Sequence, residues 1–181
     1  MIEPAVDYWS THEGQFVAGA HRYLSAARLL TDTEEWTSRP SFLQTPVLHL
    51  LCHGVELLLK FPMLRAGKSP EVVRKFGHDL ASLWESDANA TLRREIVNEG
   101  RVCWQEAQIS GKWPSDDFRV DPLTVIEKAV ADLAYLHNRG SGFALRYSFE
   151  GTLFAPRPRF LIEAFGEVAE RCVMNPGCLD S

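Results

Sequence analysis

The chain has 181 residues, of which 45% are hydrophobic and 24% are charged, and its formal net charge is −5. This length suits a single domain with a sizeable core, the composition excludes global disorder, and the negative charge argues against a protein that coats nucleic acid by bulk attraction. The first residues lack a signal-peptide pattern and no uninterrupted apolar run is long enough to span a bilayer, so we expect a soluble, cytoplasmic protein with no membrane partner.

Helical periodicity appears early in the chain. Apolar residues at helical spacing predict an amphipathic helix over 15–30, followed by a loop over 31–40. The next helix is expected to open with Thr45 as its N-cap and Pro46 at its first position, where a missing N–H costs nothing. The segment 45–64 is apolar nearly all the way round, which is typical of a helix enclosed by others.

The rest of the chain is also mostly helical in pattern. Further helical segments begin at Ser69-Pro70, His78-Asp79, Ala90, Asp121-Pro122 and Pro158. Gly100 lowers the helix propensity of 90–109 and is a point at which that helix could split. Only the aromatic-rich stretch near 145–155 favours a small β-hairpin or an extended arm. The expected fold is therefore all-α, a bundle of about five to six helices, in a single domain over 1–181 with its core at about 15–175.

Four polar residues interrupt the apolar helix, namely His49, His53, Glu56 and Lys60. At about 100° per residue they fall within a stripe about 60° wide, so all four share one face of the helix. Burying such groups without partners would cost roughly 1–3 kcal/mol each. We therefore expect partner side chains, water, a metal, a ligand or another subunit to meet this stripe.

The charged residues are distributed unevenly along the chain. Residues 56–78 and residues 136–160 each carry a local net charge of +3, although the chain as a whole is acidic. If these two segments meet in space they form a basic patch, and two separate solvated faces are an equally good alternative.

The four cysteines show neither a zinc-binding pattern nor a disulfide framework, because none of them forms a C-x-x-C pair. Cys52 and Cys103 lie in apolar helical patterns and are expected to be small core residues. The pattern favours a reduced protein.

Three segments of the chain match a known family in order. They are Glu56-Leu57-Leu58-Leu59-Lys60, Phe76-Gly77-His78-Asp79-Leu80 and Leu145-Arg146-Tyr147. In these segments the chain resembles the HEPN-like superfamily of helical bundles. The resemblance implies a homodimer that binds RNA, a nucleotide or a partner protein, in a superfamily with members in toxin–antitoxin and defence systems.

Many HEPN-like proteins are RNases that carry an Arg-x(4–6)-His motif, and this chain departs from them at that point. No arginine here has a histidine at that spacing, and the nearest case, Arg74 with His78, has only three intervening residues. Ribonuclease activity is therefore not carried over from the resemblance, and no catalytic residue or cofactor is assigned.

The leading hypothesis is a cleft in which the three segments meet around a ligand. Its lining would comprise Glu56, Lys60, His78, Asp79, Arg146 and Tyr147. Lys60 and Arg146 could hold a phosphate, Tyr147 could stack on a base, and Glu56 could orient a histidine or act as a base.

Two alternatives belong to other classes of protein. The spacing of His49, His53 and Glu56 could place three ligands toward a divalent metal in a helical-bundle enzyme, with a fourth ligand from His78, Asp79 or His137. Apart from that role, His12, His21 and His137 belong to no constellation. The second alternative is a structural homodimer without catalysis, in which Glu56 and Lys60 form an i,i+4 pair or are satisfied across the interface.

Overall fold

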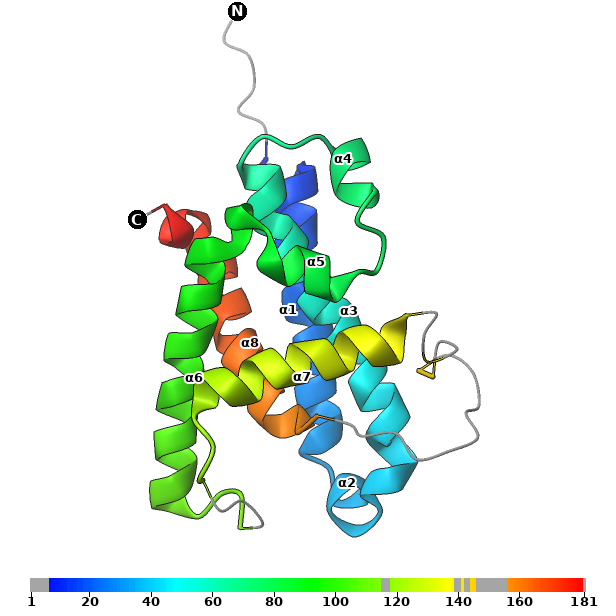
Figure 1. The fold of residues 1–181 in the computed structure, drawn as a ribbon, viewed down its shortest axis with the longest axis vertical. Coiled ribbons are helices and arrows are strands. Elements are labelled where there is room, and N and C mark those ends of the chain that lie inside the picture. The colour runs from blue at the N-terminus through cyan, green and yellow to red at the C-terminus, as the bar shows by residue number, and fades with distance from the viewer. Residues whose placement is uncertain (1–6, 115–117, 139–140, 142–143, 146–155, 181) are drawn as a thin grey trace, which may run out of the picture.

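The computed structural model describes residues 7–114, 118–138, 141, 144–145 and 156–180 (Figure 1). The arm or hairpin expected near 145–155 falls almost entirely outside these residues. Arg146 and Tyr147, two of the expected ligand-binding residues, also lie outside them.

The described part of the chain is helical and contains no strand, which confirms the all-α bundle. Five long helices form its body: α1 (His12–Thr31), α3 (Pro40–Arg65), α6 (Ala90–Ser110), α7 (Pro122–His137) and α8 (Pro158–Met174). The short helices are η1 (Tyr8–Ser10), α2 (Glu34–Ser38), α4 (Pro70–Arg74), α5 (Leu80–Glu85), η2 (Asp87–Asn89) and η4 (Pro176–Leu179).

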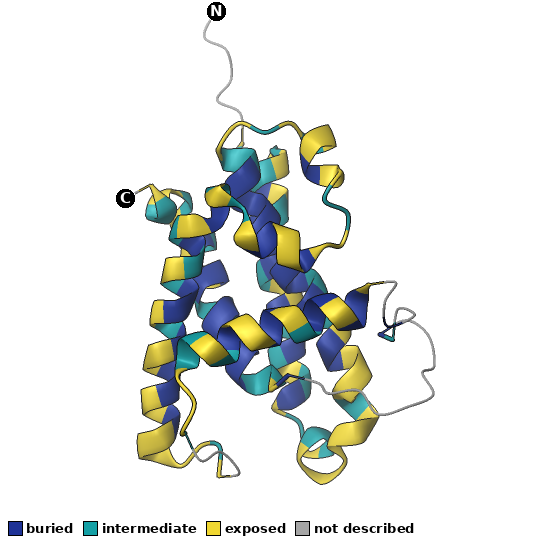
Figure 2. Cartoon of the chain, viewed as in Figure 1, coloured by how far each residue is buried: buried dark blue, intermediate teal, exposed yellow. Residues whose placement is uncertain are grey.

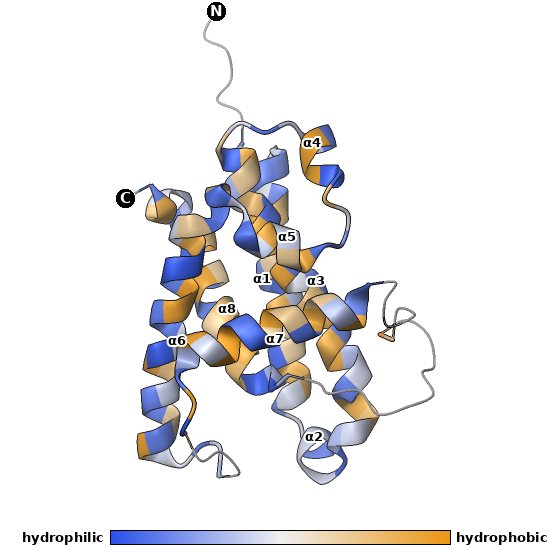
Figure 3. Cartoon of the chain, in the orientation of Figure 1, coloured by the Kyte–Doolittle hydropathy of each residue, from blue (hydrophilic) through white to orange (hydrophobic). Residues whose placement is uncertain are grey.

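Helix α3 occupies the middle of the bundle. It packs along α1 and also contacts α5, α7 and α8, while α6 lies against α8 and α7 crosses in front of the others (Figure 1). From Val47 onward most residues of α3 are buried, whereas its first turns and α2 are largely exposed (Figure 2). The apolar residues of α7 gather on the side that faces the bundle and its polar residues on the other side, as expected of a helix laid over a core (Figure 3).

Helix α3 begins earlier than expected. The prediction that Thr45 is its N-cap and Pro46 its first residue is wrong, because the helix starts at Pro40 and Pro46 lies inside it. A proline inside a helix leaves the carbonyl four residues earlier, here that of Phe42, without its hydrogen bond. Phe42 is 66% exposed, so water can replace that bond at little cost. The loop expected over 31–40 likewise contains the short helix α2.

Capping residues set the starts of α4 and α5, at the helix starts predicted from the sequence. The side chain of Ser69 accepts a hydrogen bond from the amide of Val72, and that of Asp79 accepts one from the amide of Ser82. Between the two helices Gly77 has a φ of +53°, a left-handed conformation that side chains disfavour. This turn brings His78 back toward α3.

Helix α6 runs unbroken through Gly100, so the split does not occur. A Cβ atom at this position would lie 2.6 Å from Cδ1 of Ile126 on α7. The absence of a side chain at Gly100 therefore allows α6 and α7 to cross in close contact.

Helix α3 is long and apolar enough to cross a membrane, contrary to the expectation that no run would be. In its most apolar window, however, 72% of the residues are buried within the fold. That degree of burial is typical of the core helix of a soluble protein, and the structure is consistent with one.

Candidate functional site

A buried ion pair lies at the centre of the candidate site. Nζ of Lys60 lies 2.6 Å from Oε1 of Glu56, one turn earlier on α3. The two residues are 7% and 3% exposed. Because both charges have been removed from water, each depends on the other and on further hydrogen bonds for its solvation.

The turn between α4 and α5 supplies those further hydrogen bonds. Lys60 donates to the carbonyl of Gly77 at 2.7 Å, and Nδ1 of His78 lies 2.8 Å from Oε2 of Glu56. The structure therefore brings together Glu56, Lys60 and His78, three of the residues expected to bind a ligand. The side chain of His78 is 48% exposed, so a ligand in solvent can reach its ring.

The end of α7 adds His137, which the sequence offered only as one possible fourth ligand of a metal site. His137 is 2% exposed, and its Nε2 lies 3.9 Å from Oε2 of Glu56. Its ring also meets the ring of His78 edge-on, with the centroids 4.9 Å apart. The available signal was its spacing, since His137 follows Ile126, Val130 and Leu133 on the buried face of α7.

These contacts determine the charge of the central carboxyl group. Burial by itself would raise the pKa of Glu56, but the hydrogen bonds from His78 and Lys60 outweigh it and lower the pKa. Glu56 therefore carries a negative charge at neutral pH and acts as the acceptor around which the other groups are oriented.

His49 and His53 share the polar stripe but not the central cluster. His49 is exposed, with its ring centroid 6.2 Å from that of His137. His53 is half-buried, and its ring packs edge-on against Tyr23 of α1 at 4.4 Å. Burial lowers the pKa of His53 and favours the neutral imidazole, as suits a ring packed against an aromatic neighbour.

The side chain of Asp79 binds residues at the start of α5 and does not contact the central cluster. Its carboxylate accepts hydrogen bonds from the amide and the hydroxyl of Ser82, and the hydroxyl lowers the pKa of this exposed group most. Asp79 therefore caps α5, and the structure does not bring it into the central cluster.

Exposed cations precede the cluster residues Gly77 and His78 in the chain. Arg74 and Lys75 are exposed just before the Gly77 turn. Lys68 lies over the ring of Phe76, with Nζ 5.8 Å from the ring centroid. Of the other cations in residues 56–78, Lys60 pairs with Glu56, and Arg65 pairs with Glu13 and Asp180. The second basic segment is only partly described.

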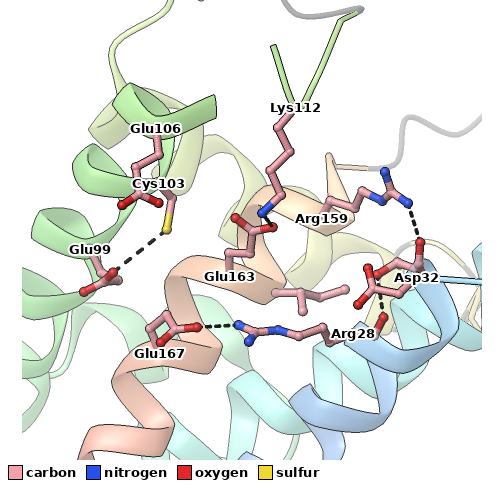
Figure 4. A pocket seen from close by; sticks show the side chains of 11 residues that line it. Arg28, Asp32, Glu99, Cys103, Glu106, Lys112, Arg159, Glu163 and Glu167 are labelled. Atoms are coloured by element: carbon pink, nitrogen blue, oxygen red, sulfur yellow. Dashed lines mark hydrogen bonds and ion pairs between the residues drawn. The ribbon is translucent and has the colours of Figure 1, made fainter. Parts of the chain in front are cut away.

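A separate polar cavity of about 450 Å³ lies among α1, α6 and α8 (Figure 4). Arg28 pairs there with Glu167 at 2.7 Å and Lys112 with Glu163 at 2.5 Å, while Arg159 donates to the carbonyl of Thr31. Its other charged residues are Asp32, Glu99 and Glu106.

Burial and the neighbouring glutamates raise the pKa of the Cys103 thiol in this cavity to about 12, so it is unreactive. The sequence signal for the cavity is the helical spacing of Glu99, Cys103 and Glu106 on α6 and of Glu163 and Glu167 on α8. With most of its cations already paired to its own carboxylates, the cavity is the weaker candidate for a site.

Comparison of the chain with models of protein families, with curated proteins and with solved structures finds no match. The resemblance to HEPN-like bundles therefore rests on the motifs alone.

Proposed function

We propose that this chain is a HEPN-like binding protein of the cytoplasm that holds RNA or a nucleotide at the cluster of Glu56, Lys60 and His78. The observation that carries the proposal is the direct contact between the two motif segments. Glu56 and Lys60 come from the E-L-L-L-K segment, and Gly77 and His78 come from the G-H-D-L segment.

The geometry suits a module that presents an oriented imidazole ring to a ligand in solvent. Glu56 and Lys60 neutralise each other, and the second carboxylate oxygen of Glu56 fixes the ring of the half-exposed His78. A phosphate that approaches the ring from solvent finds Arg74 and Lys75 on the same stretch of chain. Phosphate contacts from such cations supply most of the affinity of sequence-independent RNA binding.

The proposal is binding and not RNA cleavage. The Arg-x(4–6)-His motif of the RNase members is absent from the sequence. Among the described residues, His78 contacts the carboxylate of Glu56, and the sequence places no arginine at the spacing of that motif from it.

The test measures binding of a labelled single-stranded RNA by fluorescence anisotropy at a series of salt concentrations, with EDTA present. The double variant Arg74→Ala/Lys75→Ala should weaken binding. It should also reduce the slope of log K against log salt by about 1.4, since each lost phosphate contact contributes about 0.7 for a single strand.

The matched control removes two exposed arginines elsewhere, as Arg22→Ala/Arg101→Ala, and keeps the same net charge as the test variant. It should bind like the wild type. An equal loss of RNA affinity in both double variants would show that RNA is attracted only by the overall charge of the protein and not by a site at Arg74 and Lys75. Failure of the wild type to bind RNA, ATP or GTP at low salt would contradict the proposal and leave a protein partner as the alternative.

We also propose a homodimer, as the resemblance implies. Sedimentation equilibrium should then give twice the chain mass of 20.4 kDa. Lys60→Ala is not expected to dissociate it, because Lys60 finds Glu56 and Gly77 within its own chain. A single species of one chain mass at all concentrations would contradict the dimer.

A further inference from the structure

We propose that Glu56, His78 and His137 form a binding site for a divalent first-row transition metal ion. This site differs from the set of His49, His53 and Glu56 that the helical spacing favoured. It shares Glu56 and His78 with the proposed RNA site, but metal binding can be measured without nucleic acid.

The donor atoms of the three residues converge. Oε2 of Glu56, a ring nitrogen of His78 and a ring nitrogen of His137 all lie within 4.8 Å of one another. Two of the separations are 2.8 Å and 3.9 Å. Ligands about 2.0–2.1 Å from a tetrahedral ion are about 3.4 Å apart, so small side-chain shifts would seat an ion among these atoms.

The chemistry of the donors selects the class of ion. Two imidazoles and one carboxylate suit zinc, iron, cobalt or nickel better than magnesium or calcium, which prefer oxygen ligands. The ion would take the place of the hydrogen between Nδ1 of His78 and Oε2 of Glu56. Water or a ligand would complete its coordination, because His78 lies at the surface of the cluster.

The surroundings hold the carboxylate in the orientation that an ion needs. Lys60 binds Oε1 of Glu56, the oxygen that the ion does not use, and its own position is fixed by the carbonyl of Gly77. Such outer contacts orient a metal-binding carboxylate. The positive charge of Lys60 also repels the ion, so we expect weaker binding than at a site with a neutral neighbour.

The three ligands come from three separate elements. Glu56 lies on α3, His78 in the turn before α5, and His137 in the last turn of α7. An ion at this point would therefore tie the middle helix to two elements packed against it, and its binding should stabilise the folded chain by mass action.

The experiment titrates the full-length chain, treated with EDTA and then freed of it, with Zn²⁺ in a calorimeter and with Co²⁺ by visible absorption. We expect one ion per chain, a rise in the melting temperature with Zn²⁺, and a Co²⁺ spectrum typical of nitrogen and oxygen ligands. His78→Gln and His137→Gln should each weaken binding by about tenfold or more, because even loss of an outer contact costs about 10–100-fold.

His49→Gln and His53→Gln are the matched controls, since they remove the same kind of side chain from the polar stripe of α3 that carries Glu56. Both should bind like the wild type. His78 is half-exposed, so His78→Gln keeps the test valid if the variant of the buried His137 does not fold.

Absence of stoichiometric binding by the wild type would overturn the proposal. So would binding that survives in His78→Gln and is lost in His49→Gln or His53→Gln, which would place the ion on the outer part of the stripe. The RNA-binding test is run in EDTA, and the metal titration is run without RNA. If the wild type binds no RNA but binds one Zn²⁺ ion per chain, only the RNA proposal fails, and the reverse result would contradict only the metal proposal.

Discussion

Replacing Lys60 with methionine should lower the free energy of unfolding by about 3 kcal/mol, because it leaves the buried carboxylate of Glu56 without its ammonium partner. Methionine keeps most of the apolar stem of the lysine, so the lost charge and not a cavity should dominate the effect. Urea unfolding followed by circular dichroism measures the change.

A double variant separates the cost of an unpaired charge from the value of the pair. Glu56→Gln/Lys60→Met removes both charges and should recover most of the stability lost in Lys60→Met. Lys128→Met is the exposed control, since Lys128 and Asp132 have the same spacing and the same 2.6 Å separation as the buried pair. It should cost less than about 0.5 kcal/mol. Equal losses at Lys60 and Lys128 would show that burial adds nothing to the pair.

The same double variant should change how stability depends on pH. The pKa of Glu56 is lowered in the folded state, so its contribution is present above its ordinary range and is lost as pH falls through the folded-state pKa. The wild type should therefore lose stability more steeply below about pH 5 than Glu56→Gln/Lys60→Met does. Parallel curves for the two proteins would contradict this account of Glu56.

Replacing Gly54 with valine should also destabilise the fold by about 3 kcal/mol, through overpacking between α1 and α3. A Cβ atom at Gly54 would lie 2.8 Å from Cγ of Leu24 and 3.3 Å from the carbonyl oxygen of Ala20. Leu24 is 1% exposed and its branch point cannot swing aside, so the two helices must separate. Thermal or urea unfolding would report the loss.

Alanine substitutions at two helical glycines provide the control. Gly54→Ala introduces the clash but gains helix propensity, so a net loss of about 1 kcal/mol is expected. At Gly166 the nearest atom to an added Cβ is Nη2 of Arg28 at 3.3 Å, the far end of a flexible side chain. Gly166→Ala should therefore be neutral or stabilising by up to about 1 kcal/mol. A stable Gly54→Val protein would mean that the α1–α3 contact is looser than the structure indicates.

Local signals in the sequence were sufficient for most helix starts and for the fold class. Ser69, Asp79 and Asp121 cap helices α4, α5 and α7, which start where the sequence predicted, because a cap depends on hydrogen bonds to amides two or three residues away. The start of α3 was predicted too late in the chain. Pro46 lies inside the helix, where the hydrogen bond it removes can be replaced by water, so it destabilises the helix less than a buried proline would.

The sequence by itself also determined that Glu56 and Lys60 share one buried face of an apolar helix, since a 3.6-residue period places them there. Only the tertiary structure decided which groups meet that face. His78 reaches it through the left-handed Gly77 turn and His137 through the crossing of α7, whereas His49 and His53 remain outside the central cluster. Periodicity specifies the face of one helix, but the contact between two faces depends on how the helices pack across the whole core, and no local pattern records that packing.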